Sequence, residues 1–195
     1  MLIHSGLSRL ALAGACAAAS VACTACSVAG DGAGKTMTGS LASHSTQVQP
    51  LGTADPAPKT QRPSAPAQLA VAGVRVGAHE GFDRVVVDLE GEGTPGWFVD
   101  YTSTPIQETV AQPLQVAGNS FLNINIDGTV APYELGKDTT APVTMAGDTG
   151  NVIDVINAGT YEGRSQIVVG LRSDLPYSVQ VVEDPMRVVV DIVQK

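Results

Sequence analysis

The chain has little of what covalent or metal chemistry requires. It contains only three cysteines in 195 residues, and these are Cys16, Cys23 and Cys26. The part of the chain that we expect to fold has no cysteine and a single histidine, His79. Metal centres are built from clusters of His, Cys or carboxylate side chains, and a disulfide needs two cysteines. The folded part is therefore expected to hold no metal, no cofactor and no disulfide.

Positive charge and aromatic rings are also scarce. There are 11 Lys and Arg residues against 19 Asp and Glu residues, which gives a net charge of −8. Nucleic-acid binding depends on neutralising phosphates with Lys and Arg, so this balance argues against a nucleic-acid partner. Only 4% of the residues are Phe, Trp or Tyr, and one is Trp, so few rings are available as platforms for sugars.

The familiar catalytic arrangements are missing from the sequence. No serine lies in a G-x-S-x-G motif, and a Ser-His-Asp triad would have to use His79. The run Asp88, Glu90, Glu92 imitates part of a calcium-binding loop, yet the twelfth position of such a loop would be Val99 rather than Glu. We therefore predict no catalytic residue and do not expect an enzyme.

Residues 1–25 have the features of a secretory signal. One positive residue, Arg9, precedes an Ala/Leu/Val-rich stretch without carboxylates, which ends in small residues. A cysteine at the end of such a signal suggests a lipoprotein, in which the thiol is acylated. Cys26 is the preferred site and Cys23 the alternative. The prediction is an exported protein held at the cell membrane by an N-terminal lipid, with plain secretion as the alternative.

Residues 26–68 are predicted to form a disordered tether. They are rich in Gly, Ala, Ser, Thr and Pro and contain almost no large apolar side chains. Such a stretch cannot bury enough apolar surface to offset its chain entropy. Residues 69–195 remain as one domain, which is long enough to enclose a single core.

One pentad, RVVVD, occurs twice in this domain, at residues 84–88 and 187–191. Strand side chains alternate between two faces, so each copy has an apolar face and a face that carries Arg and Asp. If the copies pair antiparallel with Val86 opposite Val189, Arg84 faces Asp191, and Asp88 faces Arg187. In the competing arrangement the two copies lie in different sheets.

The remaining pattern predicts an all-β protein. Short strands are expected at residues 70–78, 82–89, 96–102, 114–117, 121–126, 152–161, 166–171, 177–182 and 186–193. Loops are expected at 91–96, at 105–113 (with a short helical turn possible) and at 129–150. Strands at this spacing without a convincing helix favour a single β-sandwich of two packed sheets, with an open barrel as the alternative.

Several segments, in order, resemble the AMIN-like domain of actinobacterial exported proteins and lipoproteins. They are residues 79–88 (HEGFDRVVVD), 159–163 (GTYEG), 169–171 (VGL), 176–177 (PY) and 184–191 (DPMRVVVD). The one departure is Met186, where the family commonly has a second proline. The resemblance covers about residues 72–193 and implies a sandwich of two sheets without catalytic residues.

The resemblance also implies a role in the cell envelope. The related AMIN domain precedes cell-wall amidases and occurs in pilus secretins, where it directs proteins by binding peptidoglycan. We therefore expect a non-catalytic domain that binds a cell-wall glycan polymer. The alternatives are docking of an envelope protein at a sheet edge and, last, an unrecognised hydrolase. The candidate binding residues are Arg84, Trp97, Phe121, Asn123 and Asn125, although for Trp97 a position in the core is the favoured interpretation.

Overall fold

The structure is a computed structural model that describes residues 47–137, 141–146 and 150–194. The predicted signal and both candidate lipidation sites, Cys23 and Cys26, lie outside these residues. No described helix is both long and apolar enough to cross a membrane.

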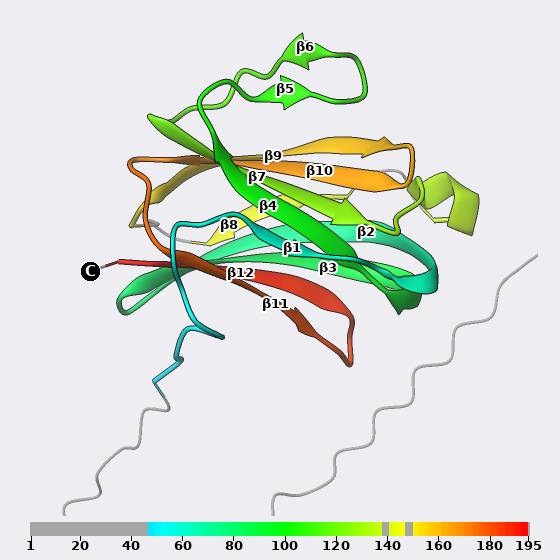
Figure 1. Cartoon of the computed structure of the whole chain (residues 1–195), viewed down its shortest axis with the longest axis horizontal. Coiled ribbons are helices and arrows are strands. Elements are labelled where there is room, and N and C mark those ends of the chain that lie inside the picture. Colours follow the sequence, from blue (N-terminus) through cyan, green and yellow to red (C-terminus); the bar gives the residue numbers. More distant parts are fainter. Residues whose placement is uncertain (1–46, 138–140, 147–149, 195) are drawn as a thin grey trace, which may run out of the picture. The chain divides into compact units, whose positions relative to one another are not determined.

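Two five-stranded sheets pack face to face (Figure 1). The first, sheet A, has the strand order β11-β12-β3-β2-β8, and the second, sheet B, has the order β1-β4-β7-β10-β9. Sheet A consists of β2 (Ser64–His79), β3 (Phe82–Thr94), β8 (Val143–Ala146), β11 (Tyr177–Val182) and β12 (Arg187–Val193). Sheet B consists of β1 (Lys59–Gln61), β4 (Gly96–Thr102), β7 (Ser120–Asp127), β9 (Val152–Tyr161) and β10 (Arg164–Leu171). The predicted all-β sandwich is confirmed.

The core lies between the sheets and is made largely of β-branched and leucine side chains. Val85, Val87, Val188, Val190 and Ile192 from sheet A are each fully buried. They face a matching set from sheet B, which includes Val99, Leu122, Ile124, Ile126, Ile167 and Val169. Alternation along each strand sends every second side chain into this layer.

The two pentads pair directly. Strand β12 runs antiparallel to β3 with Val189 opposite Val86, and Asp191 lies opposite Arg84. This confirms the register predicted from the repeat and excludes the alternative in which the copies occupy different sheets.

The first difference from the prediction is at β3, which runs through the glycines that were expected to form a loop. Gly91 has φ +131°, and a Cβ there would lie 2.1 Å from the carbonyl oxygen of Gln68 on β2. The glycine therefore allows close approach of two long strands rather than a turn.

The second difference is at the front of the domain, because residues 47–68 are not the free tether that was predicted. Lys59–Gln61 form β1 and pair with β4, and β2 already begins at Ser64. Asp55 bridges to Tyr177 through two backbone hydrogen bonds of 3.1 Å. Backbone pairing needs no large apolar side chain, so a composition argument does not detect it.

Three smaller segments also differ from the expectation. Residues 114–117 form no strand, and residues 105–113 contain a hairpin of β5 (Ile106–Gln107) and β6 (Gln112–Pro113). The expected excursion over 129–150 contains a short 3₁₀ helix, η1 (Pro132–Leu135), and strand β8, which pairs parallel with β2. These elements are two to four residues long, too short for sequence periodicity to reveal them.

Candidate functional site

A groove of about 610 Å³ lies on the outer face of sheet A. Its lining comes from β2, β3, β8, β11 and β12 and from two residues that precede β1, Val48 and Leu51. The groove therefore spans the whole width of the sheet, and the RVVVD pair forms its centre.

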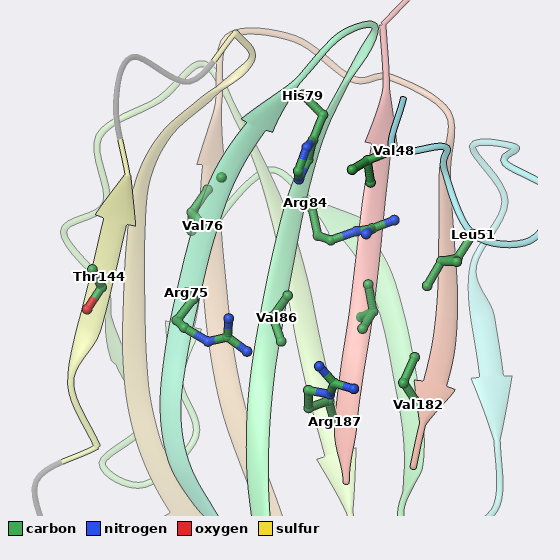
Figure 2. Close-up of a pocket in the computed structure, with 12 residues that line it drawn as sticks. Val48, Leu51, Arg75, Val76, His79, Arg84, Val86, Thr144, Val182 and Arg187 are labelled. Carbon is green, nitrogen blue, oxygen red and sulfur yellow. The ribbon is translucent and has the colours of Figure 1, made fainter. Parts of the chain in front are cut away.

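The shape of the groove follows from which side chains are short and which are long. Val86 and Val189, the central residues of the two pentads, lie opposite each other and form a low floor. Gly77 adds no side chain on β2. Figure 2 shows the long side chains of Arg75, Arg84 and Arg187 around Val86, on three adjacent strands.

The segment before β1 forms one wall of the groove. The backbone N–H of Leu51 donates to Oδ2 of Asp191 at 2.6 Å, and the Ser178 hydroxyl donates to the Leu51 carbonyl oxygen. The carbonyl of Gln49 accepts a hydrogen bond of 3.1 Å from Nη2 of Arg84. These contacts hold the segment against Ser178 on β11, Asp191 on β12 and Arg84 on β3.

Two of the three arginines have a carboxylate partner. Arg84 holds Asp191 in a bidentate pair, with Nε to Oδ1 at 2.6 Å and Nη2 to Oδ2 at 2.8 Å, and Asp191 is fully buried. Arg75 holds Asp88 in the same way, with both hydrogen bonds at 2.7 Å. These hydrogen bonds to Asp88 raise the pKa of Arg75 above its ordinary value.

The third arginine, Arg187, has no carboxylate partner among the described residues. Its register partner across the sheet is Asp88, as the repeat predicted. Asp88 nevertheless pairs with Arg75, and the Nε of Arg187 donates instead to the carbonyl oxygen of Pro185 at 3.1 Å. The two carboxylates thus neutralise two of the three arginines. The groove therefore carries one excess positive charge, which is that of Arg187.

The structure does not bring the sequence-predicted binding residues together. Arg84 lies on the outer face of sheet A, while Phe121, Asn123 and Asn125 belong to β7 of sheet B. Trp97 is only 7% exposed and packs in the core, so its ring is not a surface platform. The structure confirms the favoured interpretation of Trp97 as a core residue.

The polar side chains of β7 are less accessible than the sequence suggested. Phe121 is half-buried rather than freely exposed, and Asn125 is 3% exposed with its Oδ1 atom unpartnered among the described residues. The Asn123 carboxamide oxygen accepts a hydrogen bond of 3.1 Å from Nε2 of Gln166. Gln166 in turn contacts the β5–β6 hairpin, accepting from Glu108 N at 3.0 Å. The hairpin was not predicted, so the sequence did not indicate that it covers the polar face of β7.

Exposed aromatic rings occur elsewhere in the domain. Phe98, Tyr133 and Tyr161 are 37%, 68% and 49% exposed. Tyr161 lines a smaller cavity of about 350 Å³ together with the ion pair of Arg164 and Asp127. None of these rings lines the arginine groove.

A buried carboxylate organises the end of the sandwich near the groove. Asp83 is fully buried and accepts three backbone N–H groups, from Gly150 at 3.0 Å, Asn151 at 2.6 Å and Val152 at 2.9 Å. This carboxylate satisfies the backbone N–H groups at the start of β9 and so connects β9 to β3. This explains Asp83 as a structural residue. Among the described residues, no three His, Cys, Asp or Glu side chains gather in one place.

The family model of the AMIN-like domain matches residues 69–194, which is more than half of the chain. No curated protein and no solved structure matched the chain.

Proposed function

The chain belongs to the AMIN-like domain family, and from this premise we propose that it is a non-catalytic protein of the cell envelope that binds peptidoglycan. The family relates the domain to the cell wall. The observation that carries the proposal further is the groove of about 610 Å³ across sheet A, which offers a continuous recessed surface to an extended polymer.

The proposed location is the outer side of the cell membrane. The signal-like residues 1–25 and the cysteine that follows them support export and acylation at Cys26, with Cys23 as the alternative. Two acyl chains on one cysteine are sufficient for lasting attachment, whereas a single chain binds only marginally. Plain secretion is the alternative, and mass spectrometry of the mature N-terminal peptide distinguishes the two.

Sedimentation with insoluble peptidoglycan tests the proposed function. The purified protein is mixed with peptidoglycan at low and moderate salt, and the pellet is compared with pellets obtained without polymer and with insoluble cellulose. We expect the protein in the peptidoglycan pellet only. If it stays in the supernatant at both salt concentrations, wall binding is wrong and docking to an envelope protein becomes the better explanation.

A further inference from the structure

We propose that the groove between Arg75 and Arg187 recognises a carboxylate of the peptidoglycan stem peptide. This rests on the proposed function, because it names the part of the polymer that the domain contacts. The glycan strand then serves as the backbone that presents the peptide.

The charge of the groove favours an anionic ligand. The protein as a whole is acidic, with a net charge of −8, yet this groove has three arginines in its lining. Asp191 neutralises Arg84 and Asp88 neutralises Arg75, which leaves Arg187 without a counter-charge among the described residues. A guanidinium is a planar donor that matches a carboxylate in a bidentate fashion. An anionic group is the ligand that completes this arrangement.

The positions of Arg75 and Arg187 allow them to share one ligand. Arg75 lies opposite Val86 on β3, and Arg187 is two residues from Val189, which lies opposite Val86 on β12. Two strand spacings and two residue steps place the Cα atoms of the two arginines about 12 Å apart. The Arg75 guanidinium is held on Asp88, which lies opposite Arg187 on β12. The two guanidinium groups therefore lie toward the same part of the groove, where one anion can contact both. Figure 2 shows Arg75 and Arg187 on opposite sides of Val86.

Arg75 can take part although it is already paired. Its side chain is 54% exposed, and it uses Nε and Nη2 to hold Asp88. A guanidinium has five N–H donors, so three of them remain for a ligand. The pair with Asp88 therefore fixes the direction of the Arg75 side chain and still leaves N–H donors for a ligand.

The apolar lining of the groove favours a peptide over a sugar or a phosphate. The floor consists of Val86 and Val189, and Val182 extends the apolar lining. Stem peptides combine free carboxylates with the methyl groups of alanine, so they match both the arginines and the valines. A phosphate has no apolar part to bury, and a sugar prefers an aromatic platform. Among the described residues that line the groove the one ring is His79, which stacks on Phe82 with centroids 4.7 Å apart.

The test is calorimetric titration of the purified protein with a soluble disaccharide-tetrapeptide, compared with the same compound after amidation of its carboxylates. Chitotetraose and inorganic phosphate are the sugar and phosphate probes. We expect binding of the free acid and at least tenfold weaker binding of the amide, because the arginines then face a neutral group. Equal binding of acid and amide, or binding of chitotetraose or phosphate instead, overturns the proposal.

Three variants locate the binding in the groove. Arg187→Gln should weaken binding of the acid at least tenfold, whereas Arg62→Gln, an exposed arginine outside the groove, should leave it within twofold. Gly77→Val fills the groove without changing its charge and should also weaken binding. A Cβ at Gly77 approaches only Nε2 of His79, at 3.8 Å, which is an ordinary van der Waals contact. If Arg187→Gln and Gly77→Val both bind like the unaltered protein, the groove is not the site.

Sedimentation separates failure of this inference from failure of the proposed function. If the unaltered protein and Arg187→Gln both sediment equally with peptidoglycan, wall binding stands and the groove assignment is wrong. If neither sediments, the proposed function is wrong and this inference falls with it.

Discussion

The RVVVD repeat provides a stability prediction with its own internal control. Each copy contributes one aspartate to a bidentate pair with an arginine: Asp191 with Arg84, and Asp88 with Arg75. The chemistry of the two pairs is the same, but their exposure differs. Asp191 and Arg84 are 0% and 17% exposed, whereas Asp88 and Arg75 are 29% and 54% exposed.

Asp191→Asn should therefore destabilise the protein much more than Asp88→Asn. Removing one partner of a buried ion pair leaves an uncompensated charge and costs about 3 to 5 kcal/mol. An exposed pair contributes about 0 to 1 kcal/mol, because water solvates the remaining partner. In Asp191→Asn the guanidinium of Arg84 stays beneath the segment that includes Gln49, where water replaces the lost carboxylate poorly.

Urea unfolding measures the difference. With a slope of about 2 kcal/mol per molar urea, Asp191→Asn should lower the midpoint by about 2 M and Asp88→Asn by less than about 0.5 M. Trp97 is the only tryptophan and is buried in the core, so its fluorescence reports the loss of the sandwich. Equal shifts of the two midpoints would show that burial does not govern these pairs and would refute the reasoning.

Three further predictions concern residues outside the groove. Asp83→Ala removes the acceptor of three backbone N–H groups and should lower the free energy of unfolding by about 3 kcal/mol in the same urea assay; a loss below about 1 kcal/mol would mean that water replaces the carboxylate. Burial raises the pKa of Asp100, so the folded state holds that proton more tightly, and stability falls as the pH rises from below about 3.9 through the raised value. Asp100→Asn should consequently raise the Tm at pH 7 and have little effect at pH 3, and a lower Tm at pH 7 contradicts this. Tyr177→Phe deletes a hydroxyl that lies 3.0 Å and 2.8 Å from two backbone carbonyl oxygens and should cost about 1 to 2 kcal/mol, measured by urea unfolding; a neutral result would show that neither contact matters.

The sequence alone determined the parts of this protein that depend on alternation. Val85, Val87, Val188 and Val190 were predicted to share a buried face, and all four are fully buried. If the two pentads pair, the same pattern fixes their register, because a shift of one residue would turn the apolar faces to solvent. That they pair directly, rather than lying in different sheets, was decided by the structure. The order of the motifs also identified the family that the comparison shows.

Only the tertiary structure decided where the cavity lies and which charges are paired. The register predicted Arg187 opposite Asp88, but register fixes Cα positions and does not choose between two arginines within reach of one carboxylate. Asp88 pairs with Arg75 of the neighbouring strand β2, and this frees Arg187. Sequence reasoning about one strand pair could not include a third strand.

Contacts with a third segment also explain why Asn123 and Asn125 were predicted to lie on an accessible binding face, although they are largely covered. Alternation correctly placed Asn123 and Asn125 on one face of β7, but it does not say what covers that face. The cover is a two-stranded hairpin whose strands have two residues each, which leaves no periodic signal. Accessibility depends on contacts between segments far apart in the chain, and these exist only once the sandwich is assembled.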